Sequence, residues 1–199
     1  MGGTLPPSAQ GRGKTVIRRA RASDADAIGC IHVETWLATY AGVLPDNYLV
    51  QLSRRRCAAR WYTELKAGDR AQPVVVAEDV DEGVVGFTSF GAMRCAGMSS
   101  EKFYDGEIFT LYVLPDHQGR GLGRALLSAG FYGLARAGRT SAVVWVIGSN
   151  PSRFFYERMG GRLVAHRQEN FAGIALQELA YGWPKLVVGA RAGGGETAF

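Results

Sequence analysis

Residues 107–136, EIFTLYVLPDHQGRGLGRALLSAGFYGLAR, decide how this chain folds. Their apolar first part, residues 108–114, predicts a strand, and the glycine-rich segment 119–123 after the next turn predicts the start of a helix. Glycines let the backbone approach a ligand closely, and the unpaired N–H groups at the start of a helix attract negative charge. The stretch therefore predicts a cradle for a ligand that carries phosphate.

The rest of the chain supplies further strands and helices around this stretch. Apolar runs predict strands at 15–20, 73–78, 84–94, 142–147, 162–166 and 174–183. Ser23 and Asn150 each precede a helical segment and are its expected N-cap, a further helical region spans 48–65, and polar residues 96–105 predict a loop. This order predicts an α+β fold with a mixed sheet, in which a right-handed crossover joins the central strand to the strand at 142–147.

Length and composition fit a single soluble domain. The chain has 199 residues, of which 47% are hydrophobic and 21% charged, enough for one substantial core. We expect one domain at 15–184, between a flexible N-terminal tail at 1–14 and a C-terminal tail at 185–199. The first residues lack the apolar segment of a signal peptide, and no apolar run reaches about 18 residues, so no membrane partner is expected.

The cysteine content and the net charge argue against a disulfide-stabilised, a zinc-binding and a nucleic-acid-binding protein. Cys30, Cys57 and Cys95 are far apart and odd in number, which predicts neither a disulfide framework nor a zinc site and fits a reducing cytoplasm; we expect no metal. The net charge of +5 suits a polyanionic ligand. It is too small and dispersed to indicate nucleic acid, and the arginine run at 54–56 is interpreted as a solvated face.

Two nucleotide-binding motifs do not fit the glycine turn. A P-loop requires Gly-x-x-x-x-Gly-Lys-Ser/Thr, and the one Gly-Lys-Thr, at 13–15, has Ser8 in place of the leading glycine. A dinucleotide fingerprint requires Gly-x-Gly-x-x-Gly, but Arg124 stands at the third glycine after Gly119 and Gly121. Neither ligand class is therefore predicted.

What remains is Gln118-x-x-Gly121-x-Gly123 after a strand, which resembles the acetyl-CoA-binding motif of the GNAT superfamily of N-acetyltransferases. Asn150 and Tyr156 follow at the spacing of the same superfamily, and the resemblance covers about residues 15–183. It implies a mixed, mostly antiparallel sheet of about seven strands, splayed between the fourth and fifth strands and flanked by about four helices. Gly161 and Arg153 depart from the residues that the superfamily commonly has at those positions in the last helical region.

The same resemblance implies where acetyl-CoA is bound, with its pantetheine arm in the gap of the sheet and its pyrophosphate at the turn. The implied contacts are Leu111, Tyr112 and Val113 on the strand, Gln118, Gly119, Arg120, Gly121, Leu122, Gly123 and Arg124 in the turn, and Asn150 and Tyr156 further on.

Acetyl transfer to an amine needs a base, an oxyanion donor and an acid for the departing thiolate. Glu107 is the strongest candidate for the base, because strand alternation places it on the face of Phe109, Leu111 and Val113. Tyr156 matches the family tyrosine that protonates the thiolate, and the Val113 N–H is the expected oxyanion donor. A surface acid and a packed tyrosine remain the structural alternatives for the two side chains.

Trp36, Tyr40 and Tyr181 are the candidates for acceptor binding, since large aromatics share a helix face or end the last strand. The favoured acceptor is a small amine, an amino acid or an amine antibiotic, with a protein N-terminus or lysine as a further option. A non-catalytic acyl-CoA sensor is the alternative function. A homodimer is common among similar proteins.

Overall fold

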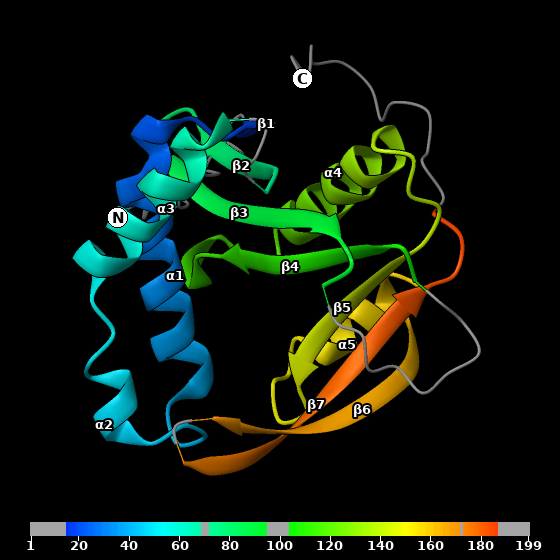
Figure 1. The fold of residues 1–199 in the computed structure, drawn as a ribbon. Helices are drawn as coiled ribbons and strands as arrows, with labels where there is room; N and C mark the ends of the chain where they lie inside the picture. Colours follow the sequence, from blue (N-terminus) through cyan, green and yellow to red (C-terminus); the bar gives the residue numbers. More distant parts are fainter. Residues whose placement is uncertain (1–14, 69–71, 95–103, 172, 187–199) are drawn as a thin grey trace, which may run out of the picture.

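The structure of this chain is a computed structural model that describes residues 15–68, 72–94, 104–171 and 173–186. Seven strands form one sheet in the order β1-β2-β3-β4-β5-β7-β6 (Figure 1). The strands are β1 (Thr15–Arg19), β2 (Val74–Asp79), β3 (Gly83–Ala92), β4 (Gly106–Val113), β5 (Ala142–Ile147), β6 (Arg162–Phe171) and β7 (Ile174–Trp183). Only β4 and β5 run parallel among these neighbours, so the predicted mixed, mostly antiparallel sheet is confirmed.

The described residues form five α-helices, one more than the approximate number expected. They are α1 (Ala25–Tyr40), α2 (Asp46–Leu49), α3 (Arg54–Lys66), α4 (Leu122–Arg136) and α5 (Arg153–Arg158). Short 3-10 helices occupy η1 (Ala22–Asp24) and η3 (Pro115–His117). No helix in the described ranges is long and apolar enough to cross a membrane.

Helices cover both faces of the sheet. Helix α4 packs on the β2, β3 and β4 face that carries Val85, Phe90 and Ile108, whereas α1 and α3 cover the opposite face at Phe87. Helix α5 packs on β6 and β7, whose hairpin extends toward the end of α1 and toward α2 (Figure 1). The core is therefore two apolar layers separated by one sheet.

Strands β4 and β5 pair only at one end and then diverge. The parallel register joins Gly106 to Ala142, Glu107 to Val143 and Ile108 to Val144, and stops there. Beyond it β5 continues to pair with β7 up to Ile147, while β4 continues to pair with β3. The predicted splay between the fourth and fifth strands is confirmed, and it leaves one edge of β4 without a strand partner.

A bulge in β4 reverses the faces that simple alternation predicts. Ser89 pairs with Thr110 and the next residue of β3 pairs with Ile108, so Phe109 is an extra residue in β4. Beyond it, Leu111 and Val113 join the core under α4. Before the bulge, Glu107 pairs with Gly91 and lies on the opposite face of the sheet from Leu111 and Val113. The Phe109 ring lies against the Cβ position of Gly91 on that same face. The prediction that Glu107 shares a face with Leu111 and Val113 is therefore wrong.

Asp105 fastens the closed end of the diverging pair. Its carboxylate accepts hydrogen bonds from the backbone N–H groups of Thr140 (2.8 Å) and Ser141 (2.9 Å) and from both hydroxyl groups (3.2 and 2.7 Å). Burial opposes the charged form, but these four hydrogen bonds hold the pKa of Asp105 at about 2, below its ordinary 3.8. The residue before β4 is thus tied to the residues before β5.

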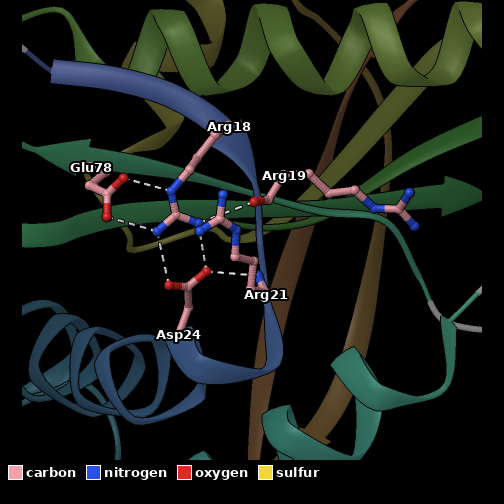
Figure 2. A network of polar contacts seen from close by, with 5 residues as sticks. All are labelled: Arg18, Arg19, Arg21, Asp24 and Glu78. Atoms are coloured by element: carbon pink, nitrogen blue, oxygen red, sulfur yellow. Dashed lines mark hydrogen bonds and ion pairs between the residues drawn. The ribbon is translucent and has the colours of Figure 1, made fainter. Parts of the chain in front are cut away.

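A second polar network joins β1 to the start of α1 (Figure 2). The Arg18 guanidinium donates to both oxygens of Asp24 (2.7 and 2.9 Å) and both oxygens of Glu78 (2.6 and 2.9 Å). Asp24 also accepts the N–H of Arg21 at 2.7 Å. These contacts fix the chain where it turns from the sheet edge into the helix that bounds the site.

Two predicted helix starts are displaced by short turns. Ser23 lies inside η1, and α1 begins at Ala25. Asn150 precedes a turn rather than the helix itself, because its side-chain oxygen accepts the Ser152 N–H at 2.8 Å and α5 begins at Arg153. The expected tail at 1–14, most of the tail at 185–199 and most of the expected loop at 96–105 lie outside the described residues.

Asp105→Ala should lower the free energy of unfolding by about 2 kcal/mol at pH 7, because four hydrogen bonds to a carboxylate are lost. The folded pKa of about 2 lies below the ordinary value, so this contribution is present above pH 4 and is lost as the pH falls toward 2. Urea unfolding at several pH values measures it, with the exposed Asp116→Ala as control. If the loss of unfolding free energy in Asp105→Ala grew toward low pH, the role assigned to the Asp105 carboxylate would be contradicted.

Candidate active site

The diverging strands open onto one large cavity of about 870 Å³. Its walls come from α1, β4, the turn before α4 and the start of α4, β5, the loop that leads to α5, α5 itself, and the hairpin of β6 and β7. The opening exists because β4 and β5 stop pairing after three residues each. The gap in the sheet and the cavity are therefore one feature.

The exposed edge of β4 presents backbone groups to this cavity. Leu114 donates its N–H to Val85 of β3 at 2.9 Å. Because successive residues of a strand direct their N–H groups to opposite edges, Val113 and Leu111 direct theirs to the open side. The Val113 carbonyl accepts the Gln118 side-chain amide at 3.0 Å. Gln118 thereby anchors the turn to the strand and leaves the Val113 N–H available.

The glycine turn has the backbone shape of an anion cradle. Gly119 and Gly121 have φ of 73° and 86°, a left-handed conformation that favours glycine. The first bond at the start of α4 runs from the Ala125 N–H to the Gly121 carbonyl, 3.1 Å. The N–H groups of 122–124 therefore have no acceptor within the helix. Gly123 lies against the Phe155 ring, 3.3 Å from where a Cβ would be.

Side chains of the turn differ in their relation to the cavity. Arg124, Gln118 and the glycines at 119, 121 and 123 line it. Arg120 is directed to the Asp116 carbonyl at 2.8 Å, and Leu122 is buried in the core under α4. Arg120 and Leu122 can therefore contribute backbone groups to the cradle, whereas their side chains point elsewhere.

Glu107 lies buried at the closed end of the gap, where it lines the cavity. Its two carboxylate oxygens accept the Arg94 backbone N–H at 2.9 Å and the Arg94 guanidinium at 3.2 Å. The same guanidinium lies 3.5 Å from the centre of the Phe109 ring. Arg94, which gave no signal in the sequence, thus fixes the orientation of the carboxylate.

Tyr156 of α5 lies across the gap from β4 and also lines the cavity. It is buried, and burial raises the pKa of its hydroxyl, with further increases from Tyr112 and Tyr40. Among the described residues none hydrogen-bonds this hydroxyl. The structure therefore holds a neutral phenol whose proton is not engaged by a neighbouring side chain.

Helix α1 contributes an aromatic wall. Trp36 donates its indole N–H to the Tyr112 hydroxyl at 2.9 Å and packs edge-on against Tyr40, with ring centroids 5.1 Å apart. Tyr40 accepts the Asn150 side-chain amide at 3.0 Å. Both polar groups of Asn150 are thus engaged within the protein, and Asn150 joins α1 to the loop before α5.

Tyr181, the third candidate for acceptor binding, is not brought to the cavity. It lies in the core on the α5 side of β7, and its hydroxyl donates to Glu157 at 2.8 Å. Strand β7 instead places Glu178 on the cavity wall, and β5 and β6 add Trp145 and Arg167. A lone acid in the apolar alternation of 174–180 was the signal for Glu178.

No group of three or more metal-ligating side chains occurs in the described ranges.

Comparisons with known proteins find relatives of this chain. The family model described as FR47-like protein matches residues 84–171, from β3 to β6. The uncharacterized N-acetyltransferase YuaI of Bacillus subtilis (strain 168) is 37% identical over 170 residues, which are 85% of this chain and 93% of YuaI. The L-amino acid N-acyltransferase MnaT of Escherichia coli (strain K12) is 38% identical over 114 residues, 56% of this chain and 58% of MnaT.

Solved structures show the same fold. The structure of yncA from Salmonella typhimurium with its cofactor acetyl-CoA is 26% identical, with a TM-score of 0.61 over 92% of this chain and 99% of that chain. The PaiA N-acetyltransferase of Thermoplasma acidophilum in complex with coenzyme A has a TM-score of 0.61 at 18% identity, covering 83% and 98% of the two chains. The chain belongs to the GNAT superfamily of N-acetyltransferases.

Proposed function

We propose that this chain transfers the acetyl group of acetyl-CoA to a primary amine. The observation that carries the proposal is the open edge of β4, which meets a glycine cradle at one end and a buried carboxylate at the other. In this reaction the amine nitrogen forms a bond to the acetyl carbon, the carbon–sulfur bond breaks, and coenzyme A leaves as a thiol. Relatives named as an N-acetyltransferase and as an N-acyltransferase support this reaction class.

The residues of the gap fit the parts of acetyl-CoA. The Val113 N–H, next to the turn, offers a strand-like hydrogen bond to an amide of a pantetheine arm. The free N–H groups that begin α4, together with Arg124, suit a pyrophosphate. Acetyl-CoA supplies an acetyl group activated as a thioester. We assign the Leu111 N–H to its carbonyl oxygen, because Leu111 is nearer to Glu107 along β4 than Val113, the donor expected from the sequence.

Glu107 is the group that we assign to accept the proton of the amine. An alkyl ammonium has a pKa of about 10.4, so at neutral pH a proton must leave before the nitrogen can attack. The Glu107 carboxylate is buried at the cavity wall and held by Arg94. Such a fixed acceptor removes the proton directly or through water.

Tyr156 is the group that we assign to protonate the sulfur. Its raised pKa keeps the phenol protonated at neutral pH, and no described residue occupies its hydroxyl. The presence of both Glu107 and Tyr156 on one cavity favours catalysis over the alternative function, a non-catalytic acyl-CoA sensor. For the acceptor we favour a small amine over a protein.

Glu107→Gln should lower kcat by about 100-fold or more and move the pH optimum upward, because the fraction of free amine then limits the reaction. Tyr156→Phe should lower kcat by at least about tenfold and leave acetyl-CoA affinity within about twofold. Thiol release between pH 6 and 10 and titration calorimetry with acetyl-CoA measure these effects. Wild-type turnover in both variants would refute the assigned roles.

Gly121→Asp should abolish acetyl-CoA binding, because it adds a negative charge to a left-handed turn that faces the cavity. Gly138→Asp is the matched control, since Gly138 ends α4 with φ of 76° and nothing near its Cβ position. Calorimetry should find no binding for the first variant and near wild-type affinity for the second. Equal affinities would show that the cradle does not hold the pyrophosphate.

A further inference from the structure

A second carboxylate, Glu178 of β7, lines the cavity and has no role in the chemistry described above. Glu178 pairs with Ile147 at the far end of β5, whereas Glu107 pairs with Val143 at its start. Four residues of β5 separate these levels, about 13 Å of strand at about 3.3 Å per residue. The two carboxylates therefore mark opposite ends of the gap.

Glu178 keeps one oxygen unused. The Nε and Nη2 atoms of Arg167 both contact its Oε2 atom, at 2.7 and 2.6 Å. Within the described parts of the chain, its Oε1 atom has no hydrogen-bond partner. Glu107 differs, because Arg94 occupies both of its oxygens. A half-buried carboxylate oxygen on a cavity wall is a strong acceptor for a cationic donor.

Two carboxylates share the guanidinium that contacts Glu178. Arg167 contacts Glu169 at 3.3 Å as well as Glu178, so one guanidinium faces two carboxylates. Its Cζ atom also lies 4.1 Å from the centre of the Trp145 ring, which holds the pair against β5. Burial raises the pKa of Tyr40, and the negative charge of Glu178 raises it further, so the field reaches α1.

The walls beside this carboxylate are aromatic. The Trp36 ring centroid lies 5.1 Å from that of Tyr40 and 5.8 Å from that of Phe171, and all three residues line the cavity. Aromatic faces attract ammonium groups, and more so where water is excluded. The arrangement is a cationic subsite with apolar sides.

We propose that the Oε1 atom of Glu178 binds a second cationic group of the acceptor, remote from the amine that is acetylated near Glu107. The preferred acceptor class is then a flexible chain with an ammonium at each end. This inference rests on the proposed function for the reacting amine. Glu178 acts as a specificity determinant and takes no part in proton transfer.

The test compares 1,5-diaminopentane with n-pentylamine, which differ in the second ammonium. Calorimetric titration of the full chain at pH 7 should give the diamine at least about tenfold tighter binding. Glu178→Gln should reduce this ratio to below about twofold. Glu169→Gln is the matched control and should keep the ratio, because Glu169 contacts the same Arg167 but does not line the cavity.

Equal wild-type affinity for the two amines, or an unchanged ratio in Glu178→Gln, would overturn the inference. Thiol release from acetyl-CoA with the same amines tests the proposed function separately. Selective diamine binding without thiol release would leave Glu178 as the cation subsite and refute the acetyl transfer to this acceptor. Thiol release without a preference for the diamine would support the proposed function and refute Glu178 as a cation subsite.

Discussion

The early end of pairing between β4 and β5 is the constraint on which the other features of the molecule depend. The two strands are held together at their first three residues, and Asp105 ties the segments in front of them. Beyond that point each strand satisfies its backbone on one side only, through β3 or β7. An unpaired strand edge inside a domain normally costs free energy, unless a ligand or water completes its hydrogen bonds. The fold thus keeps a strand edge open by preventing the sheet from closing.

The bulge at Phe109 gives this edge two different faces. Residues after the bulge direct their side chains into the core under α4, which leaves the backbone of Leu111 and Val113 as the part that meets the cavity. Residues before it direct Glu107 to the opposite face, where Arg94 fixes it. The backbone recognition and the proton transfer that we propose therefore fall on adjacent segments of one strand and do not compete for the same space.

The order of elements and the central strand–turn–helix were predictable, because they depend on local signals. The apolar runs gave the strands, and the glycines at 119 and 121 occupy the left-handed conformation that the turn requires. The bulge was not predictable, because it depends on how β3 pairs with β4 and has no signature within β4 itself. The face of β7 on which Tyr181 lies was not predictable either, because it depends on which helix covers each face of the sheet.

Site residues that act in pairs were the hardest to find. Trp36 and Tyr40 follow from helical spacing, and both line the cavity. Arg94 and Arg167 lie 13 and 11 residues from the carboxylates that they hold, and only the pairing of neighbouring strands brings them together. Asn150 was expected at a helix start or at the cofactor, and it contacts Tyr40 on a helix more than a hundred residues earlier. Tertiary contacts of this kind carry no local sequence signal.

Amide hydrogen exchange at single residues, with and without saturating acetyl-CoA, tests the open-edge account most directly. The Leu111 and Val113 amides face the gap, whereas the Tyr112 and Leu114 amides face β3. The account predicts that acetyl-CoA slows exchange at Leu111 and Val113 by at least about tenfold, with much smaller changes at Tyr112 and Leu114. Saturated binding that left Leu111 and Val113 unchanged would contradict it.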